Sequence, residues 1–138
     1  MTADAARIAH HDLCFGCGLA NVFGLQLELE ERPGGALAGR FFLKQDHQGP
    51  PGVAHPGVLA SALVEAMSLT VQRGRYASAT GLELAIHRKV PVGSYLNVES
   101  RIAGEEGGRR MATAELRDPG GEVVAEGRAL FVEAEGDR

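Results

Sequence analysis

The segment 54–67, AHPGVLASALVEAM, combines residue types that suggest a reaction site. His55 is its second residue, and its one carboxylate, Glu65, follows ten residues later. A carboxylate can activate water or attack a carbonyl carbon directly. Backbone N–H groups at a helix start can stabilise the negative charge that develops on the carbonyl oxygen. The segment therefore raises the question of whether Glu65 is a catalytic group. The alternative is that Glu65 belongs to a solvated polar stripe with Ser61, Ser68 and Gln72.

A second group of reactive side chains lies near the N-terminus. Cys14 and Cys17 form a C-x-x-C pair, and His10 and His11 lie just upstream. Four such ligands would suit tetrahedral zinc. However, a single C-x-x-C beside flexible histidines is a weak metal signal. A thioredoxin-like redox role is disfavoured because no βαβ pattern surrounds the pair. Two cysteines without a secretory leader favour a reducing, cytoplasmic location.

The reactive segment is predicted to be helical. Pro56 suits a first helical position, where its missing N–H costs nothing, and Gly74 after Arg73 suits a helix end. Two of the three stripes along this helix are apolar, so the helix should be largely enclosed. Alternating or apolar runs bounded by turn residues predict six strands around it. These runs cover residues 25–31 and 36–44 before the helix, and 80–90, 94–103, 109–117 and 122–134 after it, the last four as a meander.

This order of elements predicts an α+β fold, with an antiparallel sheet of about five to six strands wrapped around one long central helix. The chain of 138 residues fits a single domain, 1–138, with 1–13 as a loose lead-in. A net charge of -4 without a dense basic run argues against nucleic-acid binding, and no apolar stretch is long enough for a membrane span. Such a sheet leaves edges that a second copy of the chain would cover.

Four blocks of the sequence, in this order, resemble one protein family. The blocks are CFGCG (14–18) with Asn21 and GLQLEL (24–29); HQGPPGVAHPG (47–57) with VLASALVEAM (58–67); HRKVPVGSYL (87–96); and AELRDPGGEVVAEGRALFV (114–132). They resemble the hotdog-fold acyl-CoA thioesterases of the PaaI-like superfamily, in the branch with an N-terminal Cys-Phe-x-Cys-Gly motif. The resemblance accounts for the two cysteines without a metal, so no metal is expected.

The resemblance implies a homodimer, either alone or as a dimer of dimers, whose sheets join into one. Each of two sites would take the helix start from one subunit and the helix carboxylate from the other. The substrate would be an acyl-CoA thioester, with no cofactor. Gln48 would orient water or the thioester. Asn21 belongs to the first motif and is assigned to the substrate site. Arg88 and Lys89, with Arg73 and Arg75, are candidates for the CoA phosphates, or are plain surface charge.

Three positions depart from the family pattern. The residue after the motif histidine, usually a glycine whose N–H donates to the carbonyl oxygen, is Pro56 here, which has no N–H. The usual helix acid is replaced by Val64, and Glu65 is turned by about 100° from that position. The strand Ser or Thr that often assists aligns with Gly81. Gly57 is the candidate replacement donor.

Three functions remain open from the sequence. The first is thioester hydrolysis, with Glu65, His55 and Gln48 as the catalytic group and Gly57, Pro56 and Val64 lining the substrate site. The second is a degenerate protein that binds a CoA thioester or another acyl ligand without hydrolysing it. The third is a relocated lyase- or isomerase-type activity that uses Glu83 and His87, which share one strand face.

Overall fold

The computed structural model describes residues 6–72 and 77–133 of the chain. Seven strands, one α-helix and one short 3-10 helix make up these ranges. In chain order the elements are β1 (Arg7–Ile8), β2 (Glu28–Glu31), β3 (Leu37–Phe42), η1 (Gln45–His47), α1 (Pro56–Gln72), β4 (Ala77–Ile86), β5 (Tyr95–Glu106), β6 (Arg109–Arg117) and β7 (Val123–Glu133).

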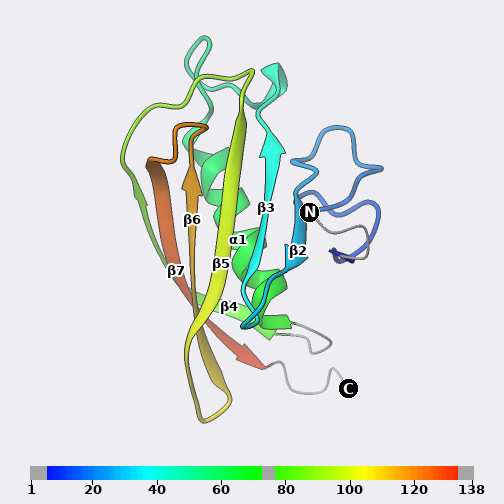
Figure 1. Cartoon of the computed structure of the whole chain (residues 1–138), viewed down its shortest axis with the longest axis vertical. Helices are drawn as coiled ribbons and strands as arrows, with labels where there is room; N and C mark the ends of the chain where they lie inside the picture. Colours follow the sequence, from blue (N-terminus) through cyan, green and yellow to red (C-terminus); the bar gives the residue numbers. More distant parts are fainter. Residues whose placement is uncertain (1–5, 73–76, 134–138) are drawn as a thin grey trace.

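All seven strands form one antiparallel sheet in the order β1-β2-β3-β5-β6-β7-β4. The hotdog fold predicted from the sequence is therefore confirmed, with one or two more strands than expected. The predicted four-strand meander is wrong in one respect. β5, β6 and β7 are successive neighbours, but β4 pairs with β7 at the far edge, while β5 pairs with β3. The α1 helix carries the chain across the sheet, so the strand that follows it enters at the opposite edge (Figure 1).

α1 lies against one face of the curved sheet, behind β5 and β6 in the view of Figure 1. It begins at Pro56, as predicted; its predicted end at Arg73 and Gly74 lies outside the described residues. One helix stripe is fully enclosed, because Leu59, Leu63, Ala66 and Thr70 are each at most 2% exposed. The facing sheet positions are alternate residues, among them Leu96 and Val98 of β5 and Ala112, Ala114 and Leu116 of β6.

The predicted strand 25–31 is shorter than its alternating pattern suggests. Leu25, Leu27 and Leu29 are all buried, as predicted, but the strand begins only at Glu28. Gln26 has a φ of 54°, which lies in the left-handed region and interrupts an extended chain. On either side of this kink, the N–H groups of Leu25 and Leu27 donate to the carbonyls of Phe15 and Gly16 instead of to a strand. Residues 25–27 therefore hold the cysteine-containing loop.

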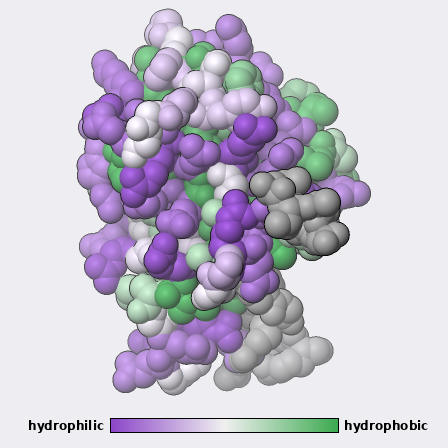
Figure 2. All heavy atoms as spheres, in the orientation of Figure 1, coloured by the Kyte–Doolittle hydropathy of each residue, from purple (hydrophilic) through white to green (hydrophobic). Residues whose placement is uncertain are grey.

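The lead-in 1–13, expected to be loose, is ordered over its described part. Arg7 and Ile8 form β1 and pair with Glu30 and Leu29 of β2. The following loop exposes several large apolar side chains, namely Leu13, Phe15, Leu19, Val22 and Phe23. Figure 2 shows a mostly hydrophilic sheet face, with hydrophobic residues gathered at the edge where this loop lies. Within the described residues, no helix has the length and hydrophobicity needed to cross a membrane.

Candidate functional site

The start of α1 presents an exposed corner made by His55, Pro56 and Gly57. His55 lies just before the helix, and Pro56 is its first residue, so the corner has one N–H fewer than an ordinary helix start. The N–H of Gly57 donates to Nδ1 of His55 at 2.8 Å. The backbone donor expected to replace the missing one therefore has a partner within its own chain. A ligand that uses this N–H must displace the imidazole.

Gln48 lies beside this corner on a small hairpin. An isolated bridge pairs Gln48 with Ala54, and the N–H of His55 donates to the carbonyl of His47 at 2.8 Å. The Gln48 side-chain oxygen accepts the N–H of Gly52 at 2.7 Å. This bond fixes the amide plane. It also leaves the Gln48 NH2 group without a partner among the described residues.

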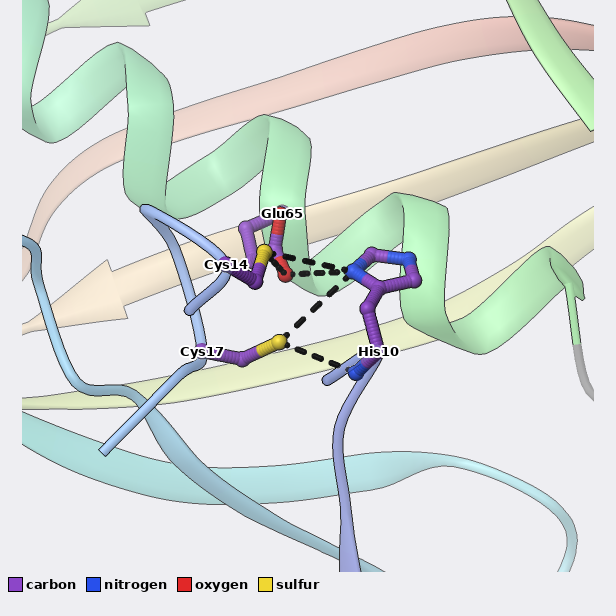
Figure 3. A group of neighbouring side chains, drawn as sticks. All are labelled: His10, Cys14, Cys17 and Glu65. Carbon is purple, nitrogen blue, oxygen red and sulfur yellow. Dashed lines mark hydrogen bonds and ion pairs between the residues drawn. The ribbon is translucent and has the colours of Figure 1, made fainter. Parts of the chain in front are cut away.

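Glu65, on the third turn of α1, faces the N-terminal segment of its own chain. Its Oε2 lies 2.9 Å from Nδ1 of His10 and 3.3 Å from the sulfur of Cys14. Cys17 joins the group, with its sulfur 3.6 Å from His10 Nδ1 (Figure 3). One ligand-type atom from each of these four residues lies within 4.8 Å of all the others. The Glu65 side chain is only 13% exposed, so it is not part of a solvated stripe.

The charges within this group are coupled. The hydrogen bond with Glu65 raises the pKa of His10 to about 9, against the opposing effect of burial. Burial raises the pKa of Glu65, but hydrogen bonds from His10 and Cys17 outweigh it, so this pKa lies below its ordinary value. Burial also raises the pKa of the Cys14 and Cys17 thiols. Without a bound ion, the group at neutral pH is therefore an ion pair between His10 and Glu65 beside two neutral thiols.

Backbone contacts hold the cysteine loop in place against α1. The N–H of Gly18 donates to the carbonyl of Cys14 at 2.8 Å, and the Arg7 guanidinium donates to the carbonyl of Cys17. Gly16 packs directly on Glu65, since a Cβ at Gly16 would lie 2.4 Å from the Glu65 Cδ atom. A Cβ at Gly18 would lie 2.2 Å from the carbonyl oxygen of Asp12. The two glycines of CFGCG are therefore required by close approach.

The other residues predicted to line the substrate site lie on separate elements of the fold. Val64 is half-buried on α1 next to Glu65. Asn21 holds a turn, because its amide donates to the Leu13 carbonyl and its oxygen accepts the N–H of Phe23. Arg88 pairs with Glu122 at 3.1 Å, whereas Lys89 is exposed and has no ion pair among the described residues. Arg73 and Arg75 lie outside the described ranges.

The relocated acid–base pair, Glu83 with His87, is not brought together. His87 lies after β4 and pairs with Glu126 at 2.6 Å. Glu83 lies near Arg128 at 3.6 Å and is highly exposed. Each residue therefore has a different partner on β7, and the structure does not provide the acid–base pair that the relocated lyase- or isomerase-type activity requires.

Sequence reasoning missed the partnership between Glu65 and the N-terminal segment. The sequence places Glu65 either in a site between two subunits or on a solvated polar stripe of the helix. It offers His10 and His11, and not Glu65, as possible zinc ligands beside the two cysteines. The structure selects His10 and excludes His11, whose Nδ1 accepts the N–H of Leu13. The signal available in the sequence was the pair of glycines in CFGCG. They indicate close packing, but they do not identify the partner.

Comparison with known proteins supports the fold. No protein-family model matches the sequence, and neither does any curated protein. Solved structures do match, and the three described below are each less than 25% identical to this chain. One, described as a thioesterase superfamily protein, is 24% identical, with a TM-score of 0.82 over 88% of this chain. This chain spans 61% of that protein's length.

Two further solved structures match over most of both chains. Zebra fish thioesterase superfamily member 2 is 15% identical, with a TM-score of 0.73 over 84% of this chain and 91% of its own. The E. coli PaaI protein from the phenylacetic acid degradation operon is 16% identical, with the same TM-score over 81% and 82%. The chain therefore has the hotdog fold of thioesterase-superfamily and PaaI structures.

Proposed function

We propose that this thioesterase-like protein binds an acyl-CoA thioester at the start of α1. The observation that carries the proposal is the exposed His55–Gly57 corner at the positive end of a 17-residue helix in a hotdog fold. A thioester carbonyl is a dipole that this helix end attracts. The free NH2 group of Gln48 and the His55 imidazole are polar groups beside it that can orient the ligand.

We propose further that the ligand lies between two copies of the chain. The edge strand β4 exposes Leu82, Leu84 and Ile86, at 49%, 37% and 42% of their surfaces. An exposed apolar edge strand can pair with a strand of another chain through its unpaired backbone N–H and C=O groups. A second copy paired through β4 would cover these side chains and extend the sheet. A homodimer, or a dimer of two such dimers, is the assembly that follows.

Binding without rapid hydrolysis is the function that the site geometry favours. Glu65 is the only carboxylate of α1, and its own chain covers it through Cys14, Gly16 and Cys17. The neighbouring helix position carries Val64, which cannot accept a proton. Pro56 supplies no N–H, and that of Gly57 is bonded to His55. General-base and oxyanion groups are therefore both blocked in this arrangement.

Hydrolysis with Glu65 as the base is the second candidate. The pairing with His10 at 2.9 Å is compatible with it, because this contact keeps the carboxylate ionised, which is the form that a general base needs. This function requires residues 14–17 to move away from Glu65 when the substrate binds. His55 and Gln48 would then orient the thioester or the attacking water.

One set of assays separates the two candidates. Wild type and Glu65→Gln are offered a panel of short, long and aryl acyl-CoAs, with thiol release and thermal unfolding as readouts. Binding alone predicts a rise in unfolding temperature without turnover, equivalent to about 2.7 kcal/mol at a ligand concentration 100 times Kd. Turnover that Glu65→Gln abolishes supports hydrolysis. Neither stabilisation nor turnover across the panel refutes the thioester proposal.

A gain-of-function variant tests the same site in the opposite direction. Val64→Asp with Pro56→Gly restores an acid and an N–H donor at the positions where the resemblance places them. Thiol release should rise by at least about 100-fold, the typical contribution of a general base or of one oxyanion donor. Val64→Asn with Pro56→Gly is the matched control, because it adds a polar group of the same size without a base. Equal rates in the two variants contradict the assignment of this cleft to thioesters.

A further inference from the structure

Four side chains from two distant parts of the sequence converge on one point at the surface of α1. His10, Cys14 and Cys17 come from the N-terminal segment, and Glu65 comes from the helix, 55 residues after the histidine. Figure 3 shows the imidazole, both sulfurs and the carboxylate pointing toward one another. Hydrogen bonding alone does not require two cysteines at this point, because the ion pair between His10 and Glu65 is complete without them.

Several distances between the four ligand atoms are close to those of a tetrahedral metal site. With metal–ligand bonds of about 2.3 Å to sulfur and about 2.0–2.1 Å to nitrogen, tetrahedral angles place sulfur and nitrogen ligands about 3.6 Å apart. The sulfurs of Cys14 and Cys17 lie 3.5 and 3.6 Å from His10 Nδ1. The Glu65 oxygen lies 3.3 Å from the Cys14 sulfur and 2.9 Å from the imidazole nitrogen. Both distances must lengthen when an ion binds, and all four ligand atoms already lie within 4.8 Å of one another.

We infer that His10, Cys14, Cys17 and Glu65 form a structural zinc site. Two sulfurs and one imidazole nitrogen in tetrahedral geometry favour Zn²⁺ over Mg²⁺ or Ca²⁺, which prefer oxygen ligands. The carboxylate fills the fourth position, so the site is closed and has no room for a reactive water. The two cysteines bind as thiolates and His10 binds through a deprotonated Nδ1, so both thiol protons and the Nδ1 proton are released to solvent. The site joins the N-terminal segment to α1 and does not depend on the thioester proposal.

The surroundings of the four residues support a metal site. The Nε2–H of His10 donates to the side-chain oxygen of Gln72 at 2.8 Å, so Nδ1 is the ring nitrogen that faces Glu65 and that binds an ion once its proton has left. Outer partners of this kind orient histidine ligands in metal sites. The backbone N–H of His10 donates to the Cys17 sulfur at 3.1 Å, a contact that stabilises a thiolate. The backbone of residues 14–18 is held by Arg7 and Leu27, so both sulfurs are placed before an ion binds.

The test begins with the metal content of the whole chain. Protein produced with zinc in the medium and purified under reducing conditions, without chelator, should contain one Zn²⁺ per chain by elemental analysis. Replacement by Co²⁺ should give the intense visible bands of a tetrahedral ion and a thiolate charge-transfer band in the near ultraviolet. This measurement needs no variant, so it decides the proposal even where a substitution prevents folding.

Variants then identify the ligands. Cys17→Ser and Glu65→Gln should each weaken zinc binding by more than the roughly 10–100-fold that loss of an outer partner costs. His11→Gln is the matched control, because His11 is adjacent to the site but bonded elsewhere. It should retain full zinc content. The inference is overturned if the reduced wild type binds no zinc and gives no tetrahedral Co²⁺ spectrum, or if His11→Gln loses zinc as completely as Cys17→Ser.

Discussion

Replacing Gly16 by alanine tests the packing of the cysteine loop on Glu65. A Cβ at this position would lie 2.4 Å from both Cγ and Cδ of Glu65 and 2.6 Å from Oε1. Ordinary contact begins at 3.4 Å, so the side chain or the loop must move by 3.4 minus 2.4, or 1.0 Å. The loop resists this movement because the Gly16 carbonyl accepts the N–H of Leu27 at 2.9 Å. The Glu65 side chain must therefore move.

The expected cost follows from that displacement. Overpacking of this size costs about 1–3 kcal/mol, or a fall in Tm of roughly 3–9 °C for a chain of this length. Metal sites tolerate ligand shifts of only about 0.2 Å, so a 1.0 Å displacement of Glu65 also removes one zinc ligand. We therefore expect Gly16→Ala to be less stable than wild type with and without zinc, and to bind zinc more weakly.

The assay is a double-mutant cycle measured by denaturant unfolding. Glu65→Ala removes the three atoms that the new methyl group would meet, so Gly16→Ala in that background should cost less than about 0.5 kcal/mol. Gly104→Ala is the control, because a Cβ there meets nothing within 4 Å. Equal costs of Gly16→Ala in the two backgrounds would show that Glu65 does not lie under the loop, and would refute the four-residue cluster with it.

Three further outcomes are expected. Burial lowers the pKa of His47, so the imidazole binds a proton more readily in the unfolded chain than in the folded chain. The stability of the folded state should therefore fall as the pH drops below about 6.5. Acid unfolding should show a shallower fall for His47→Gln than for the wild type. Gln72→Ala should weaken zinc binding by about 10–100-fold in a competition titration with a chromogenic chelator, because it frees the His10 imidazole. Thr70→Val removes the buried hydrogen bond that the Thr70 hydroxyl donates to the Ser100 hydroxyl at 2.9 Å. This change should lower the free energy of unfolding in urea by about 1–3 kcal/mol. Ser68→Ala, on the outer stripe of α1, should change it little.

Local patterns were sufficient for most elements of the fold. Pro56 located the helix start, and helical spacing identified its buried stripe, because both depend on residues within a few turns of one another. The alternation of Leu25, Leu27 and Leu29 predicted burial correctly, but it could not reveal the left-handed Gln26, since side-chain period carries no information on a backbone kink. The position of β4 at the far edge of the sheet could not be predicted from the sequence either, because it depends on how α1 crosses the sheet.

The candidate site was harder to predict because it joins distant segments. His10 and Glu65 are 55 residues apart, and no rule of sequence spacing predicts a contact between the N-terminal segment and the middle of the helix. The motif CFGCG showed where the backbone needs glycine, yet the partner that requires Gly16 is the Glu65 side chain itself. The sequence also could not distinguish His10 from His11, since both lie in the irregular segment after β1, where no periodic pattern predicts the direction of a side chain.

The two proposals restrict each other through Glu65. A carboxylate that binds zinc loses basicity to the positive charge of the ion, so a zinc-loaded site makes Glu65 a poor general base. The alignment of Glu65 one position after the expected acid then has a physical explanation. Rotation by about 100° turns the side chain from the cleft expected at Val64 toward the cysteine loop. Under the two proposals, the two adjacent helix positions serve two surfaces: Val64 leaves the proposed thioester site without an acid, and Glu65 contacts the cysteine loop.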